Sequence, residues 1–196
     1  MFEYLNGKFA EITPSYIVVD CNGVGYMIEI SLTSYSVLKD LKEGKIFTHF
    51  VVREDAQILF GFATTKEREL FRQLITVSGI GANTARMMLS SLNADELVKA
   101  IVAEDTKTIN GIKGIGTKTA QRVVVDLKDK LAKWEYSEET QIVGVAESNK
   151  NRQEALLALQ TLGFNKVIVE KTLDKILKEN SQLTVESLIK EALRRL

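Results

Sequence analysis

The sequence predicts an α+β multidomain protein in which a β-rich N-terminal part is followed by two groups of helices. Three observations predict this class. Residues 1–62 alternate polar and apolar side chains and are rich in Val, Ile, Phe and Tyr. The pattern G-I-G-x-x-T-A occurs twice in the middle of the chain, and residues 149–196 repeat apolar side chains at helical spacing. A chain of 196 residues that is 45% hydrophobic can form several small cores of this kind.

The N-terminal part, 1–62, predicts a small closed barrel. We expect strands near 2–11, 16–21, 24–30, 46–52 and 57–62, with a short helix near 34–41 between the third and the fourth. Five short strands with a helix at that place are typical of an OB-type β-barrel. Five Lys and Arg residues stand against eight Asp and Glu residues here, so we expect a scaffold or an oligomer contact.

The central segment, 63–133, contains the repeated motif as 79–85 and again as 114–120. Each copy follows a short helical run and opens a helix with an apolar face, which predicts a tandem helix-hairpin-helix. In each copy two glycines permit a tight turn with positive φ and a close backbone approach to a ligand, and the isoleucine between them can anchor the turn in the core. The unpaired N–H groups and the positive dipole end of the following helix then form an anion site.

A single G-x-G between helices is also typical of an ordinary helix end followed by a turn. Two copies in register, each with hydroxyl or amide side chains in the next helical turn, favour phosphate binding. The segment is also basic, with 12 Lys and Arg residues against eight Asp and Glu residues. The expected DNA-binding residues are Gly79, Gly81, Asn83, Thr84, Lys113, Gly114, Gly116, Thr117, Lys118, Thr119 and Arg122.

Other chemistries fit the sequence poorly. The stretch 111–119 has Thr117 where a P-loop needs lysine, and neither hairpin has the last glycine of a dinucleotide-binding fingerprint, so we expect no nucleotide cofactor. Cys21 and His49 are each the only residue of their type, which predicts no intramolecular disulfide, no metal site and no nucleophile–base pair. Cys21 is expected to be a small buried residue of a strand. Neither a membrane span nor a signal peptide is indicated, which predicts a cytoplasmic protein.

Helix-start signals divide the rest of the central segment. Thr64 with Glu67 and Asn93 with Glu96 are predicted capping boxes, and Asp105 is a predicted N-cap. The helix after the second hairpin is expected to end in Lys128, Lys130 and Lys133, whose charges suit a helix C-terminus.

Beyond this segment, residues 134–148 contain four glutamates and no basic residue, which predicts a flexible acidic linker. The tail, 149–196, predicts a bundle of three short helices with Gly163 ending the first. Most of its apolar positions are expected in the core, and so small a bundle can leave some apolar surface for a partner.

The order of these parts resembles the RuvA family, the Holliday-junction-binding subunits of the bacterial branch-migration complex. The likeness covers essentially the whole chain, and its most specific pieces are 51–57 (VVREDAQ), 59–62 (LFGF), the hairpin 114–120 and 162–164 (LGF). The resemblance implies a homotetramer, or an octamer, that binds a four-way DNA junction and holds it open and flat. It also implies a role in recombination, repair and the SOS response.

By the same resemblance, Glu54 and Asp55 form an acidic pin at the centre of the junction, although the residues alone indicate an ordinary solvated turn. The tail would recruit the hexameric ATPase RuvB, with Leu162, Phe164, Leu173 and Ile176 as candidate contacts, and the resolvase RuvC would join the resolving complex. One position departs from the family. Relatives commonly have Pro and a basic residue after the second glycine of the first hairpin, where this chain has Ala82 and Asn83.

A DNA repair enzyme of the helix-hairpin-helix glycosylase or nuclease class is the alternative function. Such glycosylases usually have one hairpin, a Gly- and Pro-rich loop and a catalytic Asp. Here the candidate Asp126 falls inside a predicted regular helix, and the only proline is Pro14. We therefore expect a non-catalytic DNA-binding subunit.

Overall fold

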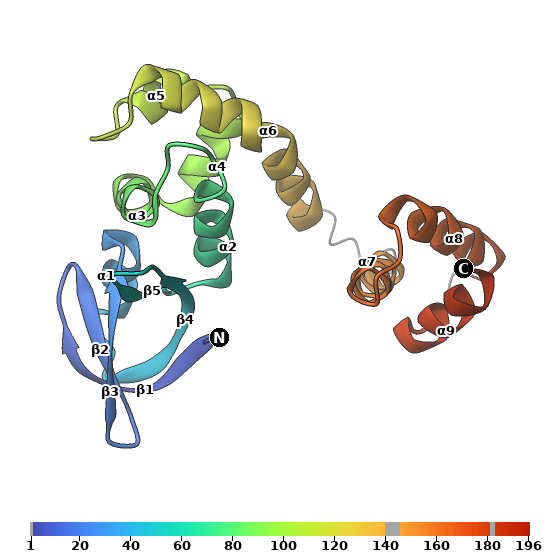
Figure 1. Ribbon diagram of the computed structural model, residues 1–196, viewed down its shortest axis with the longest axis horizontal. Coiled ribbons are helices and arrows are strands. Elements are labelled where there is room, and N and C mark those ends of the chain that lie inside the picture. Colours follow the sequence, from blue (N-terminus) through green and yellow to red (C-terminus); the bar gives the residue numbers. More distant parts are fainter. Residues whose placement is uncertain (1, 140–145, 181–182) are drawn as a thin grey trace. The chain divides into compact units, whose positions relative to one another are not determined.

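The computed structural model describes residues 2–139, 146–180 and 183–196. The chain divides into two compact units, Met1–Lys133 and Trp134–Leu196 (Figure 1), and each is described by itself.

The first unit begins with a closed barrel of five strands. Its elements are β1 (Tyr4–Ile12), β2 (Tyr16–Cys21), β3 (Val24–Ile30), α1 (Leu32–Leu38), β4 (Glu43–Val52) and β5 (Gln57–Phe62). The strands close in the order β1-β2-β3-β5-β4, and all pairs are antiparallel except β3 with β5. This confirms the OB-type barrel. Its buried core comprises Leu5, Ile17, Val19, Ile28, Ile30, Leu38 and Ile46.

Several boundaries in the barrel differ from the sequence prediction: β1 spans Tyr4–Ile12 rather than 2–11, and α1 spans Leu32–Leu38 rather than 34–41. Strand β4 begins at Glu43 rather than near residue 46, because Glu43 and Gly44 pair with β1 and extend the ladder. Helix α1 begins at Leu32 because the Ser31 side chain caps it by accepting a hydrogen bond from the Ser34 N–H. Cys21 is half-buried rather than fully buried.

Helices complete the first unit. They are α2 (Thr65–Leu74), α3 (Ala82–Ser91), α4 (Ala94–Val102), α5 (Thr106–Asn110) and α6 (Thr117–Glu139), the last of which continues beyond this unit. The caps at Asn93 and Asp105 are confirmed, and Asn93 forms the full capping box with Glu96. The prediction that α6 ends in three lysines is wrong, because the helix continues to Glu139. Lys128 forms an ion pair with Glu104, and this ion pair raises the pKa of Lys128.

The second unit contains three helices after the end of α6: α7 (Ala146–Thr161), α8 (Lys166–Glu179) and α9 (Val185–Arg195). Their shared core consists of Ala155, Leu159, Val169, Leu173, Ile176, Leu188 and Ala192. Helix α7 ends as predicted at Gly163, which has a φ of 94°. The N–H groups of Gly163 and Phe164 donate to the carbonyls of Gln160 and Leu159, so the turn is a Schellman motif.

Residues 134–148 were predicted to be an irregular linker. Both ends of that range are helical, since α6 extends to Glu139 and α7 begins at Ala146. Residues 140–145 lie outside the described part of the chain.

Four leucine and isoleucine positions of the tail that were expected on apolar helix faces are exposed: Leu162, Ile168, Leu193 and Leu196.

Candidate nucleic-acid interface

The first hairpin connects α2 to α3. Gly79 has a φ of 94°, in the left-handed region that favours glycine, and Gly81 is the N-cap of α3 with a φ of −87° and a ψ of 170°. Ile80, between them, is only 5% exposed. The isoleucine therefore anchors the loop in the core, while both glycines face solvent.

The second hairpin, between α5 and α6, repeats this geometry 35 residues later (79 to 114). Gly114 has a φ of 88° and Ile115 is 5% exposed. The Ala120 N–H donates to the Gly116 carbonyl at 2.9 Å, the same distance as the matching bond in the first hairpin. The sequence repeat is thus a structural repeat.

The two glycines of each hairpin differ in their role. Only the first of each pair has positive φ, and this glycine makes the tight turn that the sequence predicts. All four glycines lie in open space, because a Cβ built at any of them meets no atom within 4 Å. At Gly81 and Gly116, which lack positive φ, the fold therefore tolerates a side chain, and the space there is free for a ligand.

Backbone donors lie at the start of the helix that follows the first hairpin. Helix α3 begins at Gly81 without a hydrogen bond from a capping side chain, so its first N–H groups lack the partner that a Ser, Thr, Asp or Asn cap would supply. The positive end of the helix dipole lies at the same place. Asn83 is exposed and Thr84 is half-buried in the first turn of α3, and both can donate to an anion there.

The predicted cations surround the second hairpin. Lys113, Lys118 and Arg122 are all exposed, and within the described residues none of them forms an ion pair. Thr117 is exposed and its hydroxyl lies 3.5 Å from the Asn110 side-chain oxygen, whereas Thr119 is half-buried. Unneutralised charge beside free backbone N–H groups suits a polyanion.

Arg86 links the hairpins to the barrel, a role that sequence reasoning missed. Its guanidinium donates to the Ser15 carbonyl at 3.1 Å and forms an ion pair with Glu29 at 3.4 Å. On the next turn of α3, the Ser90 hydroxyl accepts the Leu32 N–H of α1 at 3.1 Å. An arginine on a helix gives no sequence signal for such a partner, because the partner residues lie in distant strands.

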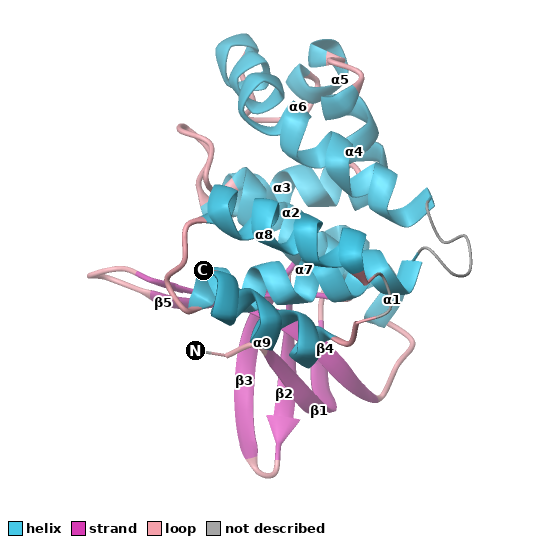
Figure 2. Cartoon of the chain, turned by 90° about the vertical axis from the view of Figure 1, so that its right-hand side faces the viewer, coloured by secondary structure: helices cyan, strands magenta, loops and turns pink. Residues whose placement is uncertain are grey.

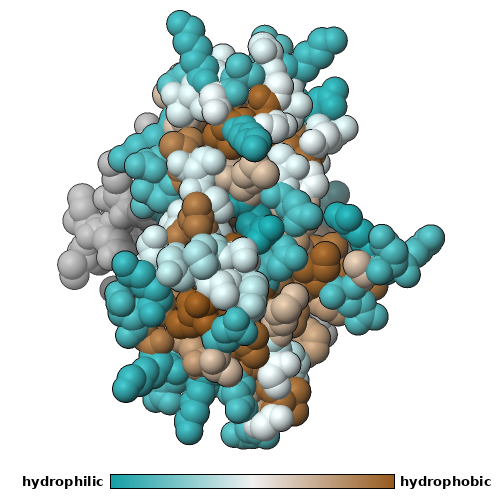
Figure 3. Space-filling view, turned by 90° about the vertical axis from the view of Figure 1, so that its left-hand side faces the viewer, coloured by the Kyte–Doolittle hydropathy of each residue, from teal (hydrophilic) through white to brown (hydrophobic). Residues whose placement is uncertain are grey.

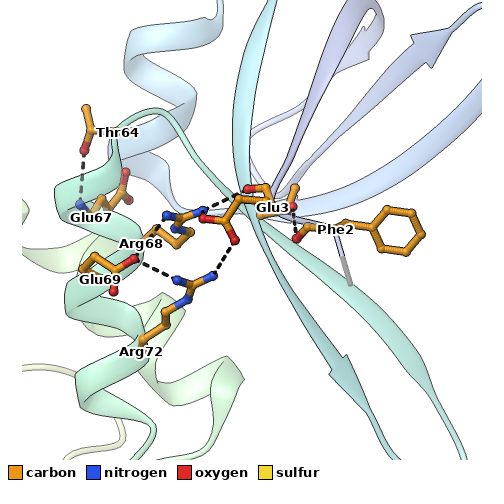
Figure 4. A network of polar contacts seen from close by, with 8 residues as sticks. Phe2, Glu3, Thr64, Glu67, Arg68, Glu69 and Arg72 are labelled. Atoms are coloured by element: carbon orange, nitrogen blue, oxygen red, sulfur yellow. Dashed lines mark hydrogen bonds and ion pairs between the residues drawn. The ribbon is translucent and has the colours of Figure 1, made fainter. Parts of the chain in front are cut away.

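A buried carboxylate fixes the same junction. Glu67 is 2% exposed and accepts hydrogen bonds from the hydroxyls of Ser31 and Ser34, the latter at 2.7 Å. The predicted capping box is therefore only half formed: the Thr64 hydroxyl accepts the Glu67 N–H (Figure 4), but the Glu67 carboxylate binds Ser31 and Ser34 at the start of α1. Burial raises the pKa of Glu67, although the serine hydroxyls oppose the shift.

A cluster of charges joins the N-terminal segment to α2. Arg68, only 6% exposed, forms an ion pair with Glu3, and Arg72 bridges Glu3 and Glu69 (Figure 4). Both arginines lower the pKa of Glu3 against the opposing effect of desolvation. Together with Arg86 and Glu67, this cluster holds the hairpins in one orientation relative to the barrel, as expected for two parts of one compact unit.

The acidic turn lies between β4 and β5, where the Arg53 N–H donates to the Ala56 carbonyl at 2.8 Å. Glu54 and Asp55 are exposed. Figure 2 shows this β-hairpin extending past the rest of the barrel, with the turn at its tip. The carboxylates are therefore carried on a projecting strand pair.

The candidate tail residues separate into two kinds. Leu162 and Phe164 are 62% and 37% exposed beside the Schellman turn, whereas Leu173 and Ile176 are fully buried in the three-helix core. Burial corrects the expectation that the latter two offer a contact surface, because a partner can reach them only if that core opens.

His49 lies where β4 meets α2. His49 packs edge-on against Phe71, with ring centroids 5.4 Å apart, and burial lowers its pKa. Across the described residues, no three His, Cys, Asp or Glu side chains gather as metal ligands would. None of the described helices combines the length and apolar character that a bilayer span requires.

Comparison with known proteins identifies the family. The model of the RuvA N-terminal domain matches residues 1–61, that of a SAM-like helix-hairpin-helix tandem matches 71–129, and that of the RuvA C-terminal domain matches 150–196. This chain belongs to the RuvA family. The RuvA proteins of Christiangramia forsetii and Flavobacterium psychrophilum are 50% and 46% identical to it over 196 residues, which is 100% of both chains in each case. That of Cytophaga hutchinsonii is 50% identical over 198 residues, covering 99% of each chain. All three RuvA relatives are described as Holliday junction branch migration complex subunits.

Proposed function

We propose that this chain binds four-way DNA junctions as a homotetramer, holds them open and flat, and recruits the RuvB ATPase for branch migration. The observation that carries the proposal is the pair of equivalent hairpins whose glycines lie in open space, together with the exposed cations Lys113, Lys118 and Arg122. Membership of the RuvA family and the names of its relatives support it.

The hairpins would bind the sugar-phosphate backbone. Backbone N–H groups at the start of a helix recognise phosphate oxygens, which carry no sequence information. The contact should therefore hold any arm of a junction equally, as a protein that moves the crossover along DNA requires.

A tetramer would match the approximate four-fold symmetry of a flat junction by presenting one hairpin pair to each arm. The barrel carries exposed apolar side chains that support an oligomer contact, namely Val24, Met27, Val37 and Val52. Figure 3 shows hydrophobic surface among hydrophilic side chains on one face of the molecule. Native mass spectrometry with and without a synthetic junction would distinguish a tetramer from an octamer.

The projecting turn with Glu54 and Asp55 would lie at the four-fold axis. Four copies would then place four pairs of carboxylates near the converging phosphates. At about 10 Å, roughly one Debye length in ordinary salt, each repulsion is weak, but the effects add and grow where water is excluded. The pin would steer strands apart and discourage a continuous duplex from crossing the centre.

The second unit would contact RuvB through the exposed pair Leu162 and Phe164, and the RuvC resolvase would join the complex on the same junction.

The chain itself would provide no catalysis and need no cofactor. A glycosylase or nuclease would cut its substrate, so labelled junction, nicked and abasic DNA incubated with the purified protein should yield no shorter products. Shifted junction bands of unchanged length are the expected result, and cleavage would overturn the proposal.

A further inference from the structure

The two hairpins differ in charge at three matched positions that face solvent. With the offset of 35 residues, Ser78 corresponds to Lys113, Asn83 to Lys118 and Met87 to Arg122. The first hairpin therefore has three neutral residues where the second has three cations. Because their backbone geometry is the same, the first hairpin would bind a phosphate with its N–H groups alone.

The arginines nearest to the first hairpin in sequence do not supply the missing charge. Arg72 forms ion pairs with Glu3 and Glu69, and Arg86 forms an ion pair with Glu29. Both are engaged with barrel or α2 carboxylates, so their charge is already neutralised.

Arg122 lies closer to the first hairpin than its place in the sequence indicates. It sits in the second turn of α6, yet its Nη1 donates a hydrogen bond to the carbonyl of Ser78, the residue before Gly79, at 3.3 Å. Its side chain is exposed, and within the described ranges this is its only hydrogen bond and it has no ion pair. The guanidinium is thus positioned at the loop of the other hairpin, with donors remaining for an anion.

We propose that Arg122 supplies the cationic phosphate contact of the first hairpin, so that the two hairpins share their charge and act as one clamp. This inference rests on the proposed function, since it names the cation of the same phosphate site. A fork of N–H groups suits the task, because one donor can hold the Ser78 carbonyl while others reach a phosphate oxygen. Lys113 and Lys118 would remain with the second hairpin.

The test is a double-mutant cycle on junction affinity, measured with the full chain at several salt concentrations. Arg122→Ala and the matched control Lys118→Ala should each weaken binding about tenfold, the loss expected for one charge-assisted hydrogen bond, and each should reduce the salt slope by about one. Asn83→Lys returns a cation to the first hairpin itself. In the Arg122→Ala background, Asn83→Lys should restore most of the lost junction affinity. In the natural chain and in the Lys118→Ala background, it should raise the affinity only slightly and by the same factor.

A coupling between positions 83 and 122 of about threefold or more, with none between 83 and 118, would support the shared cation. Equal effects of Asn83→Lys in all three backgrounds would overturn the inference and leave the proposed function standing. If neither Lys118→Ala nor Arg122→Ala weakened junction binding, the proposed function of the hairpins would itself fail. Unchanged thermal unfolding of each variant would confirm that the comparison is between folded proteins.

Discussion

Serine substitutions at Gly79 and Gly81 should separate the folding role of the hairpin from its binding role. The two glycines are two residues apart in one exposed loop, and a Cβ at either meets nothing within 4 Å. They differ in backbone conformation, because Gly79 has a φ of 94° whereas Gly81 has a φ of −87° and is the N-cap of α3. The same side chain therefore has a different physical effect at each position.

The magnitudes follow from this geometry. At Gly79 a serine must adopt a left-handed conformation, which costs about 1–3 kcal/mol of the free energy of unfolding. At Gly81 a serine can cap α3, which should change stability by only a few tenths of a kcal/mol, in the stabilising direction. The new hydroxyl would occupy the N–H groups that we assign to phosphate, and the new Cβ would stand where the DNA approaches. Loss of one such contact, about 1.5–3 kcal/mol, should weaken binding by about tenfold or more.

The assay pairs chemical denaturation with junction binding by fluorescence anisotropy. Gly81→Ser should unfold at the same or a slightly higher denaturant concentration than the natural chain, yet bind junction DNA more weakly. Gly116→Ser, the matched change in the second hairpin, should behave in the same way. A fully stable Gly81→Ser chain with unaltered affinity would refute the reasoning, because the N–H groups of the first hairpin would then have no part in DNA binding.

Three further predictions concern the pin, the second unit and the buried carboxylate. The double change Glu54→Gln with Asp55→Asn should tighten binding to linear duplex more than to a junction, because it removes repulsion at the centre. Competition binding between the two DNAs would check this. Weaker binding to both DNAs with selectivity intact would identify the turn as merely structural. A chain ending near Lys133 should still shift junction DNA on a gel but fail to support RuvB-driven migration; loss of junction binding by the folded fragment would contradict this division of roles. The raised pKa of Glu67 means that its carboxyl group binds a proton more tightly in the folded than in the unfolded state. Its contribution to stability should therefore fall as the pH rises from the ordinary pKa of 4.5 through the raised one. Glu67→Gln should therefore flatten the pH dependence of the unfolding free energy in that range, and an unchanged slope would show that Glu67 is not its source.

The sequence by itself determined most of the fold, because its signals are local. Alternating side chains in 1–62 predicted the strands of the barrel, and Gly163 predicted the end of α7 through its need for positive φ. The spacing of the two G-I-G motifs predicted two equivalent hairpins, since a motif of a few residues contains its own turn, its core anchor and its free N–H groups. The candidate hairpin residues were predicted on the same grounds, whereas the pin was found only through resemblance to the RuvA family.

The tertiary structure alone decided which side chains meet across the elements. Glu67 has the sequence signature of a capping box, but the hydroxyls of Ser31 and Ser34 compete for its carboxylate, and they lie more than thirty residues away. Arg122 belongs to the second hairpin in the sequence and reaches the first only because the hairpin loops are adjacent in space. Leu162 and Leu173 are both apolar residues on predicted helices, yet one is exposed and the other buried, because only the packing of the three helices determines which face is covered. Long-range hydrogen bonds and helix packing depend on the relative placement of distant segments, which local periodicity does not encode.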